Sequence, residues 1–387
     1  MTGKKQFLLF FLFHDGCGLE DWKKGSMSDY SLRSSIQRCK QITLSAKSSF
    51  VPTFSALPAA KREAMEILYA YTRFTDDLVD QPDIDPQSGS VLSTNTRRKL
   101  QRLNQWVAAL EATLGSLNGR EPVIADANHE AAFQALEQQF PDCAGLKLLP
   151  ALKMIVDRFK IPREPLFHLI DGVESDIEPH YFETFEDCAD YCHQVATSVG
   201  FASLAVWGTT EPLFSNPVVR AAKASGIAFQ WTNILRDLVE DYQQQRIYLP
   251  QNELRRCGLT VNQFASLLDR KNWNMQKMKP KNLSEQEQYS FREMIRRMEE
   301  FEEKWNKLLQ IQFERCEIYY TNAAPLYKLI QRDSRYVYGL MWSRYYNLYH
   351  KIRKKPLRIV QGRTRLSLFQ KLRLLLRWKF LPWRRLR

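Results

Sequence analysis

The sequence predicts an all-α fold, and three observations lead to this prediction. Apolar residues recur at helical spacing through much of the 387-residue chain, as in residues 61–80 and 95–118. We find no convincing stretch with the period of two that a strand requires. The chain has only 15 glycines and few Asn-Gly or Gly-Gly turns, which argues against an all-β fold. A hydrophobic content of 44% is enough for the core of one large helical bundle.

The predicted helices follow one another along the chain, separated by residues that break helices. Residues 28–80 are predicted to be helical with a short interruption at Ser49-Phe50, and a loop over 82–90 follows. Further helices are predicted over residues 95–118, 128–140, 146–160, 163–176, 261–270, 284–318 and 323–350.

Two more helices have clear start signals. Thr184 is the predicted N-cap of a helix over 185–207, because acidic residues fill its first turn. Asn216-Pro217 begins a helix over 217–243, since proline is favoured in the first helical turn. An extended segment, residues 246–250, leads out of this helix.

The N-terminus carries an apolar run over residues 7–13 that is too short to span a bilayer. No small-x-small cleavage site follows it, so a signal peptide is not indicated. A simpler hypothesis is that translation starts at Met27. We therefore divide the chain into a doubtful extension (1–26), a catalytic domain (27–350) and a basic amphipathic tail (351–387).

The basic charge of the chain belongs to its tail. Net charge is +13, and residues 351–387 contain fourteen Lys or Arg and no Asp or Glu; subtracting those charges leaves the rest at −1. The tail interleaves its cations with leucines and aromatic residues, a composition typical of an interfacial membrane helix. A disordered tail or nonspecific nucleic-acid binding is the alternative, and specific nucleic-acid binding is not indicated.

Cysteine usage indicates a reducing compartment. The seven cysteines are odd in number and include no C-x-x-C pair, so we expect reduced thiols in a cytosolic protein and no zinc site. With the basic tail, this predicts a cytoplasmic protein that is peripheral on the cytoplasmic membrane face.

Two acidic stretches are the candidate functional site. Residues four apart share a helix face, so Asp76 projects with Asp80, and Asn233 projects with Asp237 and Asp241. Five oxygen-bearing side chains could then converge without Cys or His, which suits Mg²⁺ held jointly with substrate phosphates. Asp77 and Glu240 lie off these faces as outer or solvated residues.

Each acidic stretch could also be explained without a metal site. Three carboxylates in five residues usually mark a solvated helix face, although the apolar residues preceding Asp76 suggest that some point inward. The second stretch follows a largely apolar helix, where acids are costly to bury and more often functional. Arg236 could pair with Asp237 or clamp a diphosphate, and Tyr248 could simply pack.

These motifs, in this order, resemble the squalene/phytoene synthase family of head-to-head prenyl synthases. The matching text is Tyr71-x-Arg73-x-x-Asp76-Asp77-x-x-Asp80, Tyr191-Cys192-x-x-Val195-Ala196-x-x-Val199-Gly200, Gln230-x-x-Asn233-Ile-Leu-Arg236-Asp237-x-x-Glu240-Asp241 and Arg246-x-Tyr248-Leu249-Pro250. The similarity runs from about Ser49 to about residue 350. It departs from the family at Gln245, where glycine is common, and in the long tail.

The resemblance implies an isoprenoid (terpenoid) synthase fold with a central cavity, and it implies a role for each matched residue. Metal ligands would be Asp76, Asp80, Asn233, Asp237 and Asp241; catalytic residues Arg73, Tyr248 and Gln230; and substrate-binding residues Ser49, Phe50, Arg73, Arg236 and Arg246. The cofactor would be Mg²⁺, with Mn²⁺ as an alternative. His193, in the matched cysteine-tyrosine stretch, is taken as structural.

The implied reaction joins two identical prenyl diphosphates head to head and releases diphosphate. Two geranylgeranyl units would give phytoene through prephytoene diphosphate; two farnesyl units would give presqualene diphosphate or squalene. NADPH is needed only for squalene, and no Gly-rich dinucleotide fingerprint is present. An alternative of another class is a non-catalytic helical assembly factor, against which all five metal-ligand positions argue.

Overall fold

The computed structural model describes residues 30–46, 51–80, 96–141, 143–178, 181–268 and 285–356, and then 359, 363–367, 369–371, 373–374 and 378. The predicted extension 1–26 and the residues Ser49 and Phe50 lie outside this part of the chain. The helices are α2 (Leu32–Ser45), α3 (Val51–Phe54), α4 (Ala59–Asp80), α5 (Thr96–Leu114), α6 (Glu130–Gln139), α7 (Leu149–Phe159), α8 (Arg163–Ser175), α9 (Phe185–Cys192), α10 (Ser198–Trp207), α11 (Asn216–Gln243), α12 (Gln251–Arg256), α13 (Val261–Leu268), α15 (Glu285–Ala323), α16 (Leu326–Leu329) and α17 (Arg335–Lys354).

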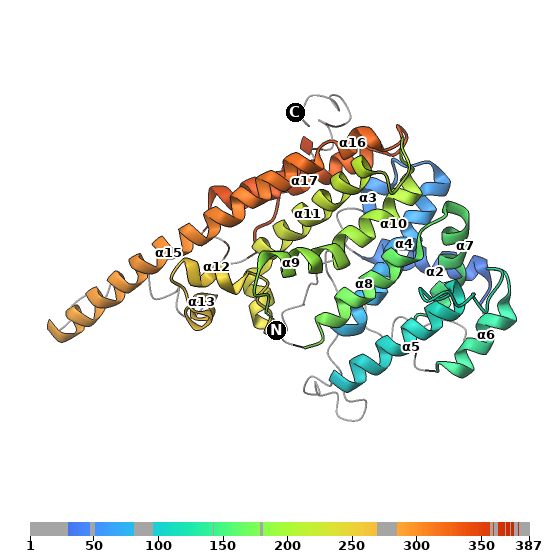
Figure 1. The fold of residues 1–387 in the computed structure, drawn as a ribbon, viewed down its shortest axis with the longest axis horizontal. Coiled ribbons are helices and arrows are strands. Elements are labelled where there is room, and N and C mark those ends of the chain that lie inside the picture. The colour runs from blue at the N-terminus through green and yellow to red at the C-terminus, as the bar shows by residue number, and fades with distance from the viewer. Residues whose placement is uncertain are drawn as a thin grey trace.

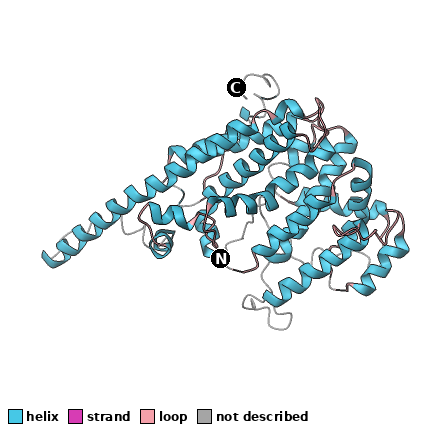
Figure 2. Cartoon of the chain, viewed as in Figure 1, coloured by secondary structure: helices cyan, strands magenta, loops and turns pink. Residues whose placement is uncertain are grey.

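The all-α prediction is confirmed. Across the described ranges the ribbon consists of helices joined by loops (Figure 2), and extended pairing is limited to isolated bridges, Tyr181 with Ile247 and Thr209 with Ile330. Thr184 caps α9 as predicted, since its side chain accepts from the Asp187 backbone N–H and the Asp187 carboxylate accepts from the Thr184 backbone N–H. None of the described helices is both long and apolar enough to cross a membrane.

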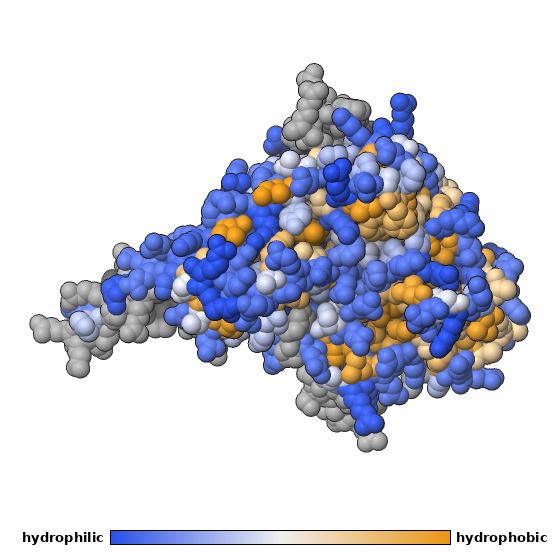
Figure 3. All heavy atoms as spheres, viewed as in Figure 1, coloured by the Kyte–Doolittle hydropathy of each residue, from blue (hydrophilic) through white to orange (hydrophobic). Residues whose placement is uncertain are grey.

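Two central helices organise the bundle. The first, α4, packs against α2, α10 and α8, while the second, α11, packs against α15 and α17 and against the segment between α9 and α10. Figure 1 shows α11 beneath α17, and α15 extending well beyond the rest of the molecule. Outer helix faces are polar, so the face in Figure 3 is mostly hydrophilic with scattered apolar patches.

The helix predicted over 185–207 is interrupted. Residues His193–Thr197 form a π-helical segment (η2) between α9 and α10. Glycines on two neighbouring helices make room for it: a Cβ at Gly172 of α8 would lie 2.5 Å from Val195, and one at Gly226 of α11 would lie 2.2 Å from Thr197. This segment therefore joins the half of the bundle that holds α4 to the half that holds α11.

The helix predicted over 323–350 is also divided. The chain turns after α15 because Pro325 begins the short α16, and α17 starts only at Arg335. The Lys61 ammonium holds this turn by donating to the Trp207 carbonyl at 2.6 Å and to Asp333 Oδ1 at 2.9 Å. The turn thus ties α4 and α10 to the last helices of the bundle.

The described part of the C-terminal tail packs on the body. Trp378 is 2% exposed and donates from Nε1 to Ser343 Oγ at 2.7 Å. Its ring lies on Gly339 of α17, where a Cβ would come within 2.2 Å of the indole. Ile359, Leu366 and Leu374 are also buried. The tail therefore has an inner face that belongs to the core.

Candidate active site

The first acidic pair lies at the C-terminal end of α4 and faces inward. Asp76 and Asp80 are only 2% and 5% exposed. The preceding residue, Thr75, accepts a hydrogen bond from Trp106 Nε1 of α5 at 3.1 Å, which fixes the rotation of α4. The sequence-based expectation that acids of this stretch point inward is therefore confirmed.

The second acidic group lies along the buried face of α11. Asn233, Asp237 and Asp241 are each 1% exposed. The Thr232 and Tyr320 hydroxyls share a 2.7 Å hydrogen bond, which fixes this helix against α15. The structure thus places all five predicted metal ligands in the interior, on two helices.

Two of the predicted diphosphate-binding arginines are held by carboxylates. Arg73 donates from Nε to Asp77 Oδ2 at 3.0 Å, with Nη2 2.7 Å from Oδ1. Arg236 donates from Nε to Asp237 Oδ1 at 2.7 Å and from Nη2 to Oδ2. Asp77 is consequently a buried partner of Arg73. Of the two roles considered for Arg236, the structure shows the salt bridge with Asp237.

A further carboxylate, Asp176, organises the mouth of the site. It accepts from the Tyr248 hydroxyl at 2.8 Å and from the Tyr191 hydroxyl at 2.9 Å, and the two rings stack at 5.0 Å. Arg246 donates to the Asp176 carbonyl, and its Nη1 lies 3.6 Å from Asp80 Oδ1. The Arg246 backbone also donates to the Asp241 carbonyl at 3.0 Å. Asp176 and Arg246 therefore connect the two acidic helices.

The sequence analysis missed Asp176. It lies just after α8 among Asp171, Glu174 and Glu178, and none of these acids is four residues away to form the pair used as a signal above. The one available signal is its setting between the buried residues Val173 and Ile177. An acid so placed needs polar partners, but those partners come from residues 191 and 246–248, which only the fold brings close.

Several buried side-chain oxygens of the predicted ligands have no hydrogen-bond partner among the described residues. These atoms are Asp76 Oδ1, both carboxylate oxygens of Asp80 and of Asp241, and Asn233 Oδ1. Gln230, fully buried one turn before Asn233, has neither amide atom hydrogen-bonded within the same part of the chain. Buried acceptors of this kind are costly unless a cation or donor satisfies them, so the residues present fit a hard divalent metal.

The two groups do not form one closed metal cage. Within the described ranges, no three His, Cys, Asp or Glu side chains come together as ligands of a single ion. The five ligands were expected to converge, but the structure places them in two groups, one on α4 and one on α11. Mg²⁺ typically takes one or two carboxylates and completes its shell with water and substrate phosphates, so this open arrangement suits a metal that arrives with a diphosphate.

Burial and mutual repulsion disfavour the charged forms of these acids. Burial and the neighbouring Asp80 raise the pKa of Asp76 well above its usual range. Burial and the neighbouring Asp237 do the same to the pKa of Asp241. Burial also raises the pKa of Asp80 to about 7, although Arg246 opposes this shift. The metal-free site therefore holds carboxyl groups that stay partly protonated.

Asp80→Asn is expected to stabilise the metal-free protein, and increasingly so as the pH rises. The unfolded carboxyl has a pKa of about 3.9, whereas the folded one titrates near 7, so the folded state binds more protons in between. Stability from this group is therefore lost as the pH rises through 7. Thermal unfolding in chelator at pH 5 and pH 8 should show the variant's advantage growing by about 3 kcal/mol between the two. The exposed Asp190→Asn serves as control, and a pH-independent advantage would contradict the assignment.

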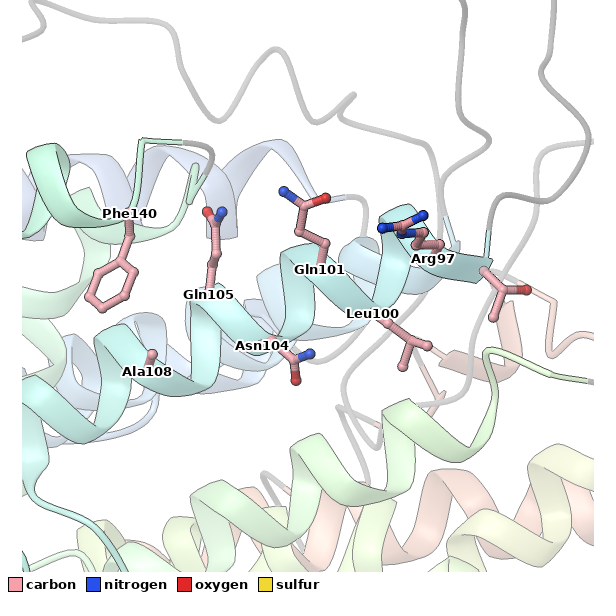
Figure 4. A pocket seen from close by; sticks show the side chains of 8 residues that line it. Arg97, Leu100, Gln101, Asn104, Gln105, Ala108 and Phe140 are labelled. Carbon is pink, nitrogen blue, oxygen red and sulfur yellow. The ribbon is translucent and has the colours of Figure 1, made fainter.

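A cavity of about 270 Å³ opens beside Asp80 and is also lined by Lys99, Asp176 and Arg246. A larger and shallower hollow of about 860 Å³ lies on α5 (Figure 4). Figure 4 shows Gln101 and Gln105 projecting from one side of α5, with Phe140 opposite. Of the predicted site residues that the structure describes, Asp80 and Arg246 line the smaller cavity, and none lines this second hollow.

The cysteines are not among the predicted site residues. The six that the structure describes are buried and form no disulfide with one another. Burial raises the pKa of the Cys39 and Cys316 thiols to about 12, so these thiols stay protonated at neutral pH.

The helical bundle defines the class of protein, an isoprenoid synthase fold. A crystal structure of a dehydrosqualene synthase in complex with ligand matches with a TM-score of 0.60 and 23% identity, covering 90% of this chain and 96% of that one. The squalene synthase HpnC from Alicyclobacillus acidocaldarius matches with a TM-score of 0.58 and 18% identity, covering 86% and 97%. At these identities the likeness establishes the fold.

Residues 45–277 match the model of the squalene/phytoene synthase family. The chain belongs to this family. Phytoene synthase of Arthrospira platensis is 29% identical over 314 residues, which is 78% of each chain. Phytoene synthase 1 of Arabidopsis thaliana is 31% identical over 269 residues, 66% of this chain and 52% of that one. The protein is therefore a prenyltransferase that condenses prenyl diphosphates head to head, and the assembly-factor reading is set aside.

Proposed function

We propose that the protein joins two geranylgeranyl diphosphates to phytoene through prephytoene diphosphate, in a Mg²⁺-dependent reaction of carotenoid biosynthesis. The observation that carries the metal requirement is the set of buried oxygens on Asp76, Asp80 and Asp241 that have no hydrogen-bond partner among the described residues. The C20 substrate is supported by the relatives, which are phytoene synthases at about 30% identity.

In this proposal Asp76 and Asp80 hold Mg²⁺, or Mn²⁺, at the end of α4, and Asn233, Asp237 and Asp241 hold it along α11. The bound metal would neutralise the diphosphate and make it a better leaving group. Arg73, Arg236 and Arg246 are buried beside acids of these two stretches, so each can pair with a diphosphate oxygen in addition to its carboxylate partner.

The aromatic residues provide the surroundings for an allylic cation. Phe182, Tyr191 and Tyr248 form a stack whose neighbouring ring centroids lie 5.0 to 6.0 Å apart. Burial and the nearby Asp176 raise the pKa of Tyr248 well above its usual range, so its hydroxyl keeps its proton and remains a donor to Asp176. Ring faces so fixed can stabilise positive charge and exclude water. Gln230 would line the same cavity, as would Ser49 and Phe50 by family resemblance.

Two farnesyl diphosphates, giving presqualene diphosphate or squalene, are the second candidate. The solved structures of similar fold include dehydrosqualene and squalene synthases, which support a C15 substrate. NADPH would be required only if the product were squalene. Hopanoid, sterol or C30 carotenoid biosynthesis would be the corresponding pathways.

Incubation of the full chain with labelled C20 diphosphate and Mg²⁺ is expected to give phytoene without NADPH. Parallel reactions with C15 diphosphate, with NADPH, and with a chelator in place of the metal provide the controls, and chromatography identifies the products. Preferential turnover of the C15 substrate would favour the second candidate. No turnover of either substrate would refute the enzymatic proposal.

We also propose peripheral contact with the cytoplasmic face of a membrane. The exposed Phe369, next to the basic residues of the tail, could enter the lipid headgroup region while the inner face stays packed. Flotation with anionic liposomes would test this, because Phe369→Ser should float less than the matched Phe214→Ser, which changes an exposed aromatic residue of the body. Equal flotation would contradict it.

A further inference from the structure

One cation of the C-terminal segment reaches the candidate metal site. Arg363 donates from Nη2 to Asp237 Oδ2 at 3.1 Å, and its Nε lies 3.0 Å from Oδ1. This side chain is 9% exposed. Asp237 lies 126 positions earlier in the chain, on α11. The contact therefore exists only because the C-terminal segment folds back over this helix.

The contact leaves Asp237 different from the other predicted ligands. Both of its oxygens are engaged by two guanidinium groups, those of Arg236 and Arg363. Asp80 and Asp241, by contrast, have no hydrogen-bond donor to either oxygen among the described residues. Asp237 is thus paired within the protein, whereas neither oxygen of Asp241 has a hydrogen-bond donor among the described residues.

Arg363 is held in place by the docking of its segment. Two residues on, the Arg365 carbonyl accepts from Lys351 Nζ of α17 at 2.7 Å. Leu366 and Leu374 are buried, and Trp378 is fixed by its bond to Ser343. The guanidinium is therefore delivered to Asp237 by a packed element of the fold and not by a free chain.

The arrangement is electrostatically crowded. Two largely buried guanidinium groups, those of Arg236 and Arg363, both contact the single carboxylate of Asp237. A cation held under such repulsion is displaced more readily than one in an isolated ion pair.

We propose that Arg363 is a latch: it occupies Asp237 in the metal-free protein and must leave that carboxylate before Asp237 can ligate a metal. This inference rests on the proposed function, because it takes Asp237 as a Mg²⁺ ligand. The latch sets the metal affinity of the α11 group and keeps the site closed until an incoming diphosphate offers Arg363 another anion. Residues far from the acidic motifs would then control the first step of metal binding.

Metal binding by the full chain without substrate tests the latch. Mn²⁺ affinity, measured by electron paramagnetic resonance, is expected to rise about fivefold or more in Arg363→Gln, because a competing charged hydrogen bond is gone. Arg365→Gln is the matched control, since it removes the same charge two residues away from an exposed side chain; it should change the affinity less than about twofold. Circular dichroism confirms that each variant is folded.

A double-mutant cycle separates the latch from a general charge effect. In an Asp237→Asn background, Arg363→Gln should no longer raise the Mn²⁺ affinity, because the contact through which it acts is absent. An unchanged affinity in Arg363→Gln, an equal gain in Arg365→Gln, or a gain that persists in the Asp237→Asn background would each overturn the latch alone. Absence of Mn²⁺ binding in every protein would overturn the metal site as well.

Discussion

Asp241→Asn is expected to lower kcat/KM by about a thousandfold or more, because it removes charge stabilisation by a bound metal. The same change should leave the metal-free protein at least as stable as the parent. Its carboxylate is 1% exposed, and neither oxygen has a hydrogen-bond partner in the described structure, so ionising it is costly. Steady-state kinetics with C20 diphosphate and thermal unfolding in chelator measure the two effects.

The comparison with Asp237→Asn sharpens this prediction. Asp237 is the shared partner of Arg236 and Arg363, so losing its charge removes a carboxylate that compensates two buried guanidinium groups. That variant should lose activity and stability together, whereas Asp241→Asn should lose activity alone. Retained activity in Asp241→Asn would refute its role as a ligand. A marked loss of stability in Asp241→Asn would show that another group of the protein hydrogen-bonds to the Asp241 carboxylate.

Gly226→Ala is expected to have the largest effect on folding. The added Cβ would lie 2.2 Å from Thr197 Oγ1 and, more seriously, 2.7 Å from its Cα and 2.8 Å from its backbone nitrogen. The backbone of the π-helical segment cannot rotate away as a side chain can, so α11 and this segment would have to move apart. We expect a loss of about 3 kcal/mol or more in unfolding free energy, at the upper end for overpacking, measured by thermal or denaturant unfolding.

Gly200→Ala is the matched control for this measurement. Gly200 lies in α10, just beyond the π-helical segment, and a Cβ there would meet nothing within 4 Å. Alanine is the better helix former, so this variant should be unchanged or slightly more stable. Equal stability of both variants would mean that α11 and the segment are less tightly packed than the structure indicates.

The main helices could be predicted from the sequence because their signals are local. The helix predicted over 217–243 agrees with α11 to within a residue, and the helical stretch predicted to residue 80 ends where α4 ends, although residues 55–58 interrupt it before α4 begins. Apolar periodicity, a proline in the first turn and the i, i+4 spacing of the acids were sufficient, since each acts within a few residues. The same spacing correctly placed the acids on buried faces.

The remaining features depend on contacts that local patterns do not encode. The π-helical segment arises where α8 and α11 present Gly172 and Gly226 to it, and nothing in His193–Thr197 alone signals it. Asp176 is recognisable as a site residue only through its hydrogen bonds with Tyr191 and Tyr248. These contacts join residues that are far apart in the sequence, so they can be identified only in the folded structure.

The docked inner face of the C-terminal segment limits where the chain can be shortened or fused. Cutting after residue 350 would strip Trp378 from Gly339 and Arg363 from Asp237 in a single step. The shortened protein would display a fresh apolar strip along α17, and such strips adsorb to lipid and to one another. A binding assay on the shortened protein could then mistake this artefact for an intrinsic affinity for lipid. Point substitutions on the outer face of the C-terminal segment are therefore the safer tool for protein engineers.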